Sequence, residues 1–335
     1  MSRRLDGGSQ VAEAAAHRAA GGRPMSSREL FVRHPGNPIL TAASWPYPAN
    51  SVFNPAAAVS GGETVLLARV EDLRGISHLT AARSANGVDG WTINPEPLLT
   101  PAEGIEAELW GFEDPRAVWV PELERWAITC TCYGPPGPAV YLATTSDFRT
   151  VERRGIVMGA EDKNAALLPE RIDGKWILFH RPSVGAVVGS GGEIVLSRSA
   201  DLKSWSTPER VLAPRSGAWW DSRRIGIGPP PLRTEHGWLV IYHGVKDTIA
   251  GGLYRVGLAL TDLADPTRVL RRAPEWVFGP EADYERSGDV PNAVFPCGLV
   301  HDEDSGQLKL YYGAADTSIC LATAQLDDVL AALGL

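Results

Sequence analysis

Short apolar runs separated by tight polar turns recur along the chain after residue 50. One copy reads AAAVSGGETVLLAR (56–69), and another reads AALLPERIDGKWILFHR (165–181). Three further copies span 116–133, 230–244 and 298–313. Turn pairs such as Gly61-Gly62 and Asp173-Gly174 are typical of the tight connection in a β-hairpin. The pattern therefore predicts five antiparallel hairpins.

A further apolar strand that ends in small residues follows each hairpin, as in YLATTSDF (141–148) and VGLALTDL (256–263). Each repeat then holds three to four antiparallel strands in about 60 residues. Five such units predict an all-β fold, a five-bladed β-propeller. A β-sandwich is the structural alternative, but a sandwich has no reason to repeat its hairpin five times.

Residues 1–27 differ from the rest of the chain, because they are rich in Ala, Gly, Ser and Arg and nearly free of large apolar side chains. They contain no apolar core of a secretory signal. We expect a disordered tail over 1–27, with Met25 as a candidate start, and a single propeller domain over 28–335. A cytoplasmic location follows from the lack of a signal.

Composition and charge narrow the function classes. The 335 residues carry a formal net charge of −8, which argues against a nucleic-acid partner because phosphates require a basic face. No apolar run approaches the roughly 20 residues of a membrane span, which argues against a membrane partner. The spacing of the four cysteines suggests neither a metal site nor a disulfide framework, so we expect buried reduced thiols.

Ionisable side chains lie near the ends of the predicted hairpin strands, where apolar residues are the rule. Because the inner strands of a propeller end near its axis, we expect these side chains to converge on one funnel. They are Arg69, Tyr133, the pairs His180-Arg181 and Tyr242-His243, and Asp316.

Two groups of residues suggest chemistry in that funnel. Glu113 and Asp114 precede Pro115, and this pair is either a turn or a source of one carboxyl with a raised pKa, since like charges disfavour double ionisation. Four cations at or near repeat edges could together hold a phosphate dianion. They are Lys163, Arg181, Arg224 and His243. Asp289 and Asp316 either cap turns or hydrogen-bond sugar hydroxyls.

The ordered segments resemble glycoside hydrolase family 130, the mannoside phosphorylases and related mannosidases, over nearly everything after residue 35. The segments include VFNPAA (52–57), FEDPRAV (112–118), DKNAALLPE (162–170), FHRP (179–182), YERSGDVPNAVFPCG (284–298) and YYGAAD (311–316). The resemblance implies a five-bladed propeller that cleaves a β-mannosidic bond with inversion. The usual nucleophile is inorganic phosphate, and the product is α-mannose 1-phosphate.

The resemblance also implies roles for individual residues. Asp114 would be the general acid and would reach the glycosidic oxygen through the 3-hydroxyl of the mannosyl residue. Phosphate would be bound by Lys163, Arg181, Arg224 and His243. The expected substrate-binding residues are Asn54, Arg69, Glu113, Asp316, Asp289, His78 and Tyr133. We expect no metal and no organic cofactor, with inorganic phosphate as co-substrate. The expected partner molecule is a β-mannoside oligosaccharide, and the protein could assemble as a homo-oligomer.

Two alternatives stay open from the sequence. A β-mannosidase that uses water needs a second carboxylate on the nucleophile side, and Glu281, Asp283 and Glu285 are the nearest candidates. The other alternative is a non-catalytic propeller that binds glycans. The loops 100–110 and 246–254 are expected to select the acceptor sugar.

Overall fold

The computed structural model describes residues 29–183, 192–249 and 251–335. The predicted tail over 1–27 and Met25 lie outside these residues. Within them the chain is all-β, as predicted, with a few short helical turns. The helical turns are η1 (Ala42–Ser44), η2 (Glu106–Glu108), η3 (Pro121–Leu123), α2 (Asp283–Arg286) and α3 (Leu326–Ala331).

Over the described residues the strands form four sheets, and the largest consists of two antiparallel groups joined by one parallel pairing, Ser77 with Gly111. We describe the strands as five antiparallel units in chain order, with the largest sheet divided at that pairing. Unit 1 holds β3 (Ser51–Ser60), β4 (Glu63–Glu71), β5 (Ser77–Ser84) and β6 (Thr92–Ile93). Unit 2 holds β7 (Gly111–Val120), β8 (Arg125–Tyr133), β9 (Ala139–Thr145) and β10 (Glu152–Met158). Unit 3 holds β11 (Asp162–Leu167), β12 (Trp176–Pro182), β13 (Ile194–Ser199) and β14 (Glu209–Leu212).

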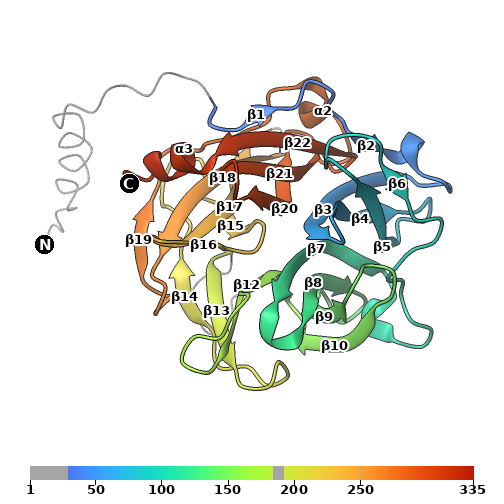
Figure 1. The fold of residues 1–335 in the computed structure, drawn as a ribbon, viewed down its shortest axis with the longest axis horizontal. Coiled ribbons are helices and arrows are strands. Elements are labelled where there is room, and N and C mark those ends of the chain that lie inside the picture. Colours follow the sequence, from blue (N-terminus) through green and yellow to red (C-terminus); the bar gives the residue numbers. More distant parts are fainter. Residues whose placement is uncertain (1–28, 184–191, 250) are drawn as a thin grey trace, which may run out of the picture.

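The last two units contain longer hairpins. Unit 4 holds β15 (Arg224–Ile227), β16 (Leu232–Thr234), β17 (Gly237–Thr248), β18 (Gly251–Thr261) and β19 (Val269–Arg272). Unit 5 holds β20 (Val294–Asp302), β21 (Gln307–Ala314) and β22 (Ser318–Gln325), joined by β1 (Val32–Arg33) and β2 (Leu40–Thr41) from the other end of the chain. The units follow one another around the middle of the molecule (Figure 1).

The turn chemistry of the sequence explains the first hairpin. Ser60 pairs with Glu63, so only Gly61 and Gly62 connect β3 to β4. Both glycines have positive φ, at 63° and 82°, which is the geometry of the two-residue turn that fits twisted strands. The hairpin predicted from Gly61-Gly62 is therefore confirmed.

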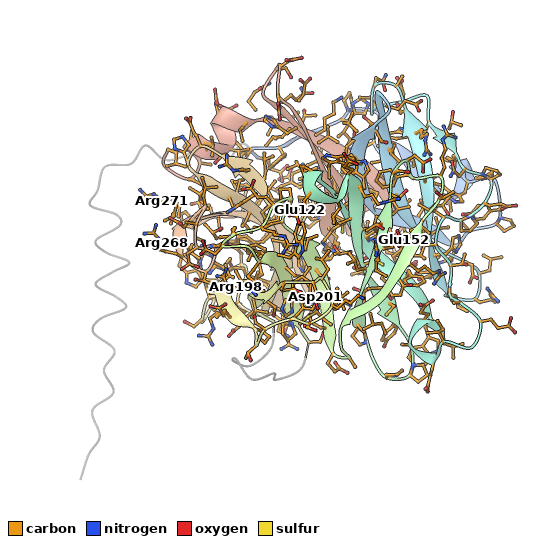
Figure 2. The ribbon with its side chains drawn as sticks, turned by 60° about the horizontal axis from the view of Figure 1, so that its bottom comes forward. Glu122, Glu152, Arg198, Asp201, Arg268 and Arg271 are labelled. Atoms are coloured by element: carbon orange, nitrogen blue, oxygen red, sulfur yellow. The ribbon has the colours of Figure 1, made fainter. Side chains whose placement is uncertain are left out.

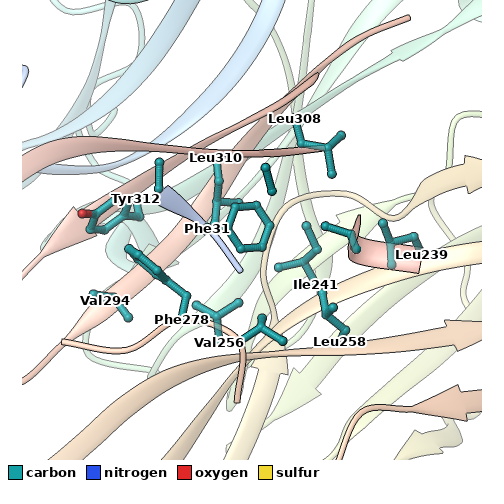
Figure 3. Packing of buried hydrophobic residues seen from close by; sticks show 14 of the residues in the cluster. Phe31, Leu239, Ile241, Val256, Leu258, Phe278, Val294, Leu308, Leu310 and Tyr312 are labelled. Carbon is teal, nitrogen blue, oxygen red and sulfur yellow. The ribbon is translucent and has the colours of Figure 1, made fainter. Parts of the chain in front are cut away.

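Five buried apolar clusters pack the units against one another. Figure 3 shows the cluster between units 4 and 5, where Leu239 and Ile241 of β17 meet Leu308 and Leu310 of β21. Three more clusters join unit 1 to unit 2, unit 2 to unit 3, and unit 3 to unit 4. The fifth joins unit 5 back to unit 1 through residues such as Tyr311 and Leu66. Each unit thus buries both faces of its sheet against its neighbours.

The two ends of the described chain meet in unit 5. Val32 pairs with Thr323 and Arg33 with Ala322, so β1 forms the outer strand beside β22. Phe31 is 1% exposed and packs into the cluster between units 4 and 5. This pairing covers a sheet edge that would otherwise present unpaired backbone groups.

Most charged side chains lie on the outside of the molecule. Figure 2 shows Arg268 and Arg271 at its outer edge, and Arg198 forms ion pairs with Glu209 and Asp265 at 3.1 and 3.4 Å. Such exposed pairs contribute about 0–1 kcal/mol each. The four cysteines are buried and free, as predicted. Among the described residues, no helix has the length and apolar character needed to cross a membrane.

Candidate active site

Three inner strands carry the same irregularity where they approach the middle of the molecule. A β-bulge interrupts pairing between Phe53 and Ala56 in β3, between Glu113 and Arg116 in β7, and between Lys163 and Ala166 in β11. At each bulge one polar residue adopts a positive φ. These residues are Asn54 (45°), Asp114 (48°) and Asn164 (53°). Asn and Asp tolerate this conformation better than other non-glycine residues, and a bulge redirects the side chain it carries.

The three redirected side chains enter one cavity of about 400 Å³, a volume typical of a small-molecule site. Nine of the twelve predicted site residues line it. They are Asn54, Arg69, Glu113, Asp114, Lys163, Arg181, Arg224, His243 and Asp316. These residues come from all five units, so the fold collects side chains that are up to about 260 positions apart in the sequence.

One end of the cavity, the acidic end, is formed by Asn54, Arg69, Glu113, Asp114 and Asp316. The Asn54 side-chain amide donates to Asp114 Oδ1 at 2.8 Å, and Arg69 donates to the same oxygen at 3.2 Å. Arg69 also donates to Glu113 at 3.2 Å and to Ser77 at 3.0 Å. The acidic end is therefore held in place by a network of hydrogen bonds around one arginine.

The charge on Asp114 is set by its neighbours. Burial alone would raise the pKa of this carboxyl, but the positive charges of Arg69, Lys163 and Arg116 and the hydrogen bond from Asn54 lower it below its usual range. The expectation that the Glu113–Asp114 pair yields an acid with a raised pKa is wrong for Asp114. The physical reason is that Arg69 of β4, Lys163 of β11 and Arg116 of β7 itself, with the hydrogen bond from Asn54, outweigh the effect of burial.

The carboxyl with a raised pKa is Asp316, which follows β21 in a left-handed conformation. Burial and the negative charge of Asp114 raise its pKa to about 7, with Arg69 acting in the opposite direction. Glu113 and Asp289 raise it further. At pH 7 the Asp316 carboxyl is therefore about half protonated.

Arg116 fixes the backbone beneath the acidic end. It is 1% exposed, and its guanidinium donates to the carbonyl oxygens of Asp114 and Gly228 at 2.7 Å and of Ile227 at 3.0 Å. These bonds tie β7 of unit 2 to the end of β15 in unit 4. The strained conformation at Asp114 is thus held by a buried charged donor, which is the stronger kind of hydrogen bond.

The other end, the cationic end, is formed by Lys163, Asn164, Arg181, Arg224 and His243. Lys163 and Arg181 are cross-strand partners on β11 and β12, and Arg224 lies at the start of β15. Arg224 donates to the Tyr254 hydroxyl at 2.5 Å. Among the described residues, neither Arg181 nor Arg224 has an ion pair with a carboxylate within 4.0 Å. Burial and the charge of Arg224 lower the pKa of Arg181 to about 10, which leaves it charged at neutral pH.

His243 belongs to the cationic end but is neutral. It is 1% exposed, and burial together with the charge of Arg181 lowers its pKa well below the usual value. Arg116, Arg224 and Lys163 act in the same direction. The expectation that His243 supplies a positive charge is therefore wrong, because a fifth positive charge would be buried beside four others. A neutral imidazole still offers one N–H donor.

Several buried polar atoms in the cavity lack a hydrogen-bond partner among the described residues. They are Asn54 Oδ1, Asn164 Oδ1, Arg181 Nε, Ser183 Oγ and His243 Nδ1. Such atoms are rare in folded proteins because each one costs free energy when it is removed from water. Their concentration in one cavity indicates a site built for a polar ligand.

Two glycines leave the space that these side chains occupy. A Cβ at Gly226 would lie 2.4 Å from His243 Cε1 and 2.6 Å from Asn164 Nδ2. A Cβ at Gly313 would lie 1.8 Å from Asn54 Oδ1. Both distances are far shorter than a carbon contact allows, so any side chain there would displace a cavity residue.

Three predicted site residues do not line the cavity. His78 lines a second, smaller cavity of about 290 Å³ beside Asp72, Arg74 and Leu109. Its Nε2 is 3.0 Å from the Tyr47 hydroxyl. Asp289 accepts a hydrogen bond from Asn50 at 3.3 Å, and Tyr133 packs edge-on against Trp110 with 5.0 Å between ring centroids. Of these three, only Tyr133 was predicted from the end of a hairpin strand, and His78 and Asp289 were expected as sugar ligands from the family resemblance.

The carboxylates considered for a water-using enzyme also lie outside the cavity. Glu281, Asp283 and Glu285 are in or next to α2, and none of them lines the cavity. Glu285 accepts hydrogen bonds from Arg33 at 2.9 Å and from the Tyr312 hydroxyl at 2.7 Å. It therefore pairs with the partly buried Arg33 in unit 5 and does not face the cavity.

Sequence reasoning missed several cavity residues. Asn164 could have been found, because FNPA, EDPR and KNAA occupy the same place in three repeats and share Asn or Asp before a bulge. Ser183, Arg223, Tyr254 and Phe295 come from strand ends and loops, and no local pattern marks them. Among the described residues, no cluster of three or more His, Cys, Asp or Glu side chains could hold a metal ion.

Comparison with known proteins agrees with this geometry. The family model described as β-1,4-mannooligosaccharide phosphorylase, glycoside hydrolase family 130, matches residues 33–334. A β-1,4-mannooligosaccharide phosphorylase from Ruminococcus albus is 34% identical over 92% of each chain. A 1,2-β-oligomannan phosphorylase from Thermoanaerobacter is 34% identical over 83% of this chain and 91% of its own.

The solved structures give the same result. β-1,2-Mannobiose phosphorylase from Listeria innocua, in complex with β-1,2-mannobiose, superposes with a TM-score of 0.82 at 29% identity. The superposition covers 91% of this chain and 99% of that one. The chain therefore belongs to glycoside hydrolase family 130. The predicted enzyme class, a β-mannoside phosphorylase, is confirmed.

Proposed function

We propose that this enzyme cleaves the terminal β-mannosidic bond of a β-1,4-linked mannooligosaccharide, or of mannosylglucose, with inorganic phosphate and with inversion. The observation that carries the proposal is that Asp114 and the cationic end line one cavity. Phosphate is an anionic nucleophile, so the enzyme needs cations to position it and one acid for the leaving group, but no second carboxylate to activate water.

Each end of the cavity has one task in this reaction. Lys163, Arg181 and Arg224 bind the phosphate dianion as charged donors, and His243 adds a neutral N–H donor. The acidic end binds the mannosyl residue. The bond between the anomeric carbon and the leaving oxygen breaks while a bond to a phosphate oxygen forms on the opposite face. The product is then α-mannose 1-phosphate.

Proton transfer follows from the charges around Asp114. Asp114 protonates the leaving oxygen through the mannosyl 3-hydroxyl. Bound phosphate offsets the positive charge that lowers the pKa of Asp114 in the free enzyme, so phosphate binding favours the protonated acid. Hydrogen phosphate loses its proton when it forms mannose 1-phosphate. This proton balances the one that the leaving oxygen of the released sugar takes up.

The five units serve this site as the blades of a five-bladed propeller. Two observations support this architecture: the units follow one another around the middle of the molecule, and five apolar clusters join each unit to the next. The irregular ends of the inner strands then face a common axis, where the cavity lies. We place the enzyme in the cytoplasm, where its free cysteines would stay reduced.

Product analysis tests the proposal. The enzyme is incubated with β-1,4-mannobiose, β-1,2-mannobiose or 4-O-β-mannosylglucose, with and without phosphate, and products are followed by ¹H and ³¹P nuclear magnetic resonance. We expect α-mannose 1-phosphate in amounts equal to the released sugar, and no release without phosphate. Release of free mannose in the absence of phosphate would indicate the mannosidase. Binding without turnover under both conditions would indicate a glycan-binding module.

A further inference from the structure

Three buried side chains in unit 3 form a continuous hydrogen-bonded array behind the cationic end. His180 Nδ1 donates to Asp162 Oδ2 at 2.7 Å, and His180 Nε2 lies 3.0 Å from Ser197 Oγ. The three residues come from β11, β12 and β13, so the array crosses the first three strands of the unit. Within the described residues, none of the three lines the cavity.

The array has the residue types of a hydrolytic triad but cannot act as one. His180 and Ser197 are both 0% exposed, and Asp162 is 7% exposed. A nucleophilic serine needs an open path to a carbonyl carbon and donors for the oxyanion, and Ser197 has no solvent-exposed surface. Any effect of the array on the reaction must therefore come from the residues next to it in the sequence, which it holds in position.

Those neighbours are the two cations that face phosphate. Asp162 immediately precedes Lys163, and its Oδ1 accepts the Lys163 backbone N–H at 2.8 Å. His180 immediately precedes Arg181. Lys163 and Arg181 are directly opposite each other across β11 and β12. The Asp162–His180 bond thus links the two strands at the register where both cations lie.

Two like charges directly opposite on neighbouring strands destabilise a sheet. The negative charge of Asp162 favours the charged form of Arg181, which burial and the charges of Arg224 and Arg116 oppose. Its two oxygens are both occupied by donors on the same strand pair. The carboxylate is therefore fixed in position and does not form a direct ion pair with Arg181 that phosphate would have to displace.

We propose that Asp162, His180 and Ser197 are positioning residues that hold Lys163 and Arg181 together for phosphate binding. This inference rests on the proposed function, because it assigns phosphate to the cationic end. It goes beyond that function by placing the support for the site in a buried array on the far side of the same strands.

The test compares two variants that each lose a buried hydrogen-bonding group. Asp162→Asn removes the charge of the array and keeps its shape. Tyr311→Phe removes a buried hydrogen bond of 2.6 Å to Gly87, outside the cavity, and is the matched control. For each variant, KM for phosphate, KM for the mannoside and melting temperature with increasing phosphate are measured.

We expect Asp162→Asn to raise KM for phosphate about tenfold or more, since hydrogen bonds to charged groups have effects of this order, and to change KM for the mannoside less than twofold. Its stabilisation by phosphate should fall in parallel. Tyr311→Phe should lower the melting temperature and leave both KM values unchanged. The proposal is overturned if both variants lose stability equally and KM for phosphate stays the same.

A second variant and a measurement that needs no turnover complete the test. If Asp162→Asn does not fold, Ser197→Ala decides in the same way, with an expected rise of about threefold in KM for phosphate and none for the mannoside. The phosphate-dependent melting temperature of the wild-type enzyme does not require turnover. A wild type that is stabilised by phosphate but forms no mannose 1-phosphate would refute the proposed function and leave the array to be judged by the melting data.

Discussion

The two ends of the cavity differ in how their charges are balanced. At the acidic end, Arg69 lies among three carboxyl groups and donates to two of them, and Asn54 donates to Asp114. At the cationic end, Arg181 and Arg224 have no carboxylate within 4.0 Å among the described residues, and His243 is kept neutral by the charges around it.

The difference shows what each end is built to bind. A preorganised and balanced network suits a neutral ligand with many hydroxyl groups, which adds hydrogen bonds without adding charge. At the cationic end Lys163 lies 3.8 Å from Glu113, but Arg181 and Arg224 have no carboxylate within 4.0 Å among the described residues. Cations without a carboxylate partner suit a dianion, since attraction between charges is strong where water is excluded. One cavity thus holds a sugar site and an anion site side by side.

The largest expected effect is a loss of kcat on substitution of Asp114, which should far exceed the loss on substitution of its neighbour Glu113. Asp114→Asn should lower kcat by about 10²–10⁴, the range expected for loss of a general acid, without unfolding the protein. Glu113→Gln changes the adjacent carboxylate and is the matched control, with a much smaller expected loss. Initial rates of mannose 1-phosphate formation measure both. Equal losses in the two variants would remove the special role of Asp114.

The next effect concerns the anion site. Arg181→Met should raise KM for phosphate about 10- to 100-fold, because a buried charged donor is lost, and should leave KM for the mannoside nearly unchanged. Arg223→Met is the control at the cavity edge, where the side chain is exposed and pairs with Asp247 at 3.0 Å. A rise in KM for the mannoside alone would show that the two ends are assigned the wrong way round.

A smaller effect tests the neutral state of His243. Because its pKa lies well below the usual value, KM for phosphate should show no inflection from this residue between pH 6 and 8. His243→Asn keeps one N–H donor and should raise KM for phosphate only about two- to fivefold. An inflection near pH 6.5 that disappears in this variant would mean that the imidazole titrates as a cation.

The smallest effect concerns stability at the acidic end. The pKa of Asp316 is about 7 in the folded protein and near 4 in the unfolded chain, so between these values the folded state binds the extra proton. Its contribution to stability therefore falls as the pH rises through this window. Asp316→Asn should raise the melting temperature by about 2 °C or more at pH 8, with a clearly smaller rise at pH 5, because only part of the window from pH 4 to 7 has been crossed there. A rise of equal size at both pH values would contradict the raised pKa.

Much of the fold could be predicted because its signals are local. Gly61-Gly62 fixes a two-residue turn by itself, and alternating apolar residues define the strands around it. Repetition of the hairpin predicts five units, and the all-β class that this repetition implies is confirmed. The residues of the cationic end could also be predicted, since Lys163, Arg181 and Arg224 lie near strand ends whose positions follow from the repeat.

The charge states could not be predicted in this way. The pKa of Asp114 depends on Arg69, Lys163 and Arg116, which come from β4, β11 and β7 and meet only in the folded protein. The neutral state of His243 likewise depends on four cations brought together from three units. The repeat also does not show which strand-end side chains enter the cavity: Tyr133 packs against Trp110 and lies outside it.

The most direct test is a crystal structure of the enzyme with α-mannose 1-phosphate, because this product contains both groups that the cavity is proposed to bind. The account predicts phosphate oxygens within hydrogen-bonding distance of Arg181 and Arg224, and the mannosyl 3-hydroxyl on Asp114. A phosphate group bound beside Arg69, with the sugar against Arg181 and His243, would contradict it.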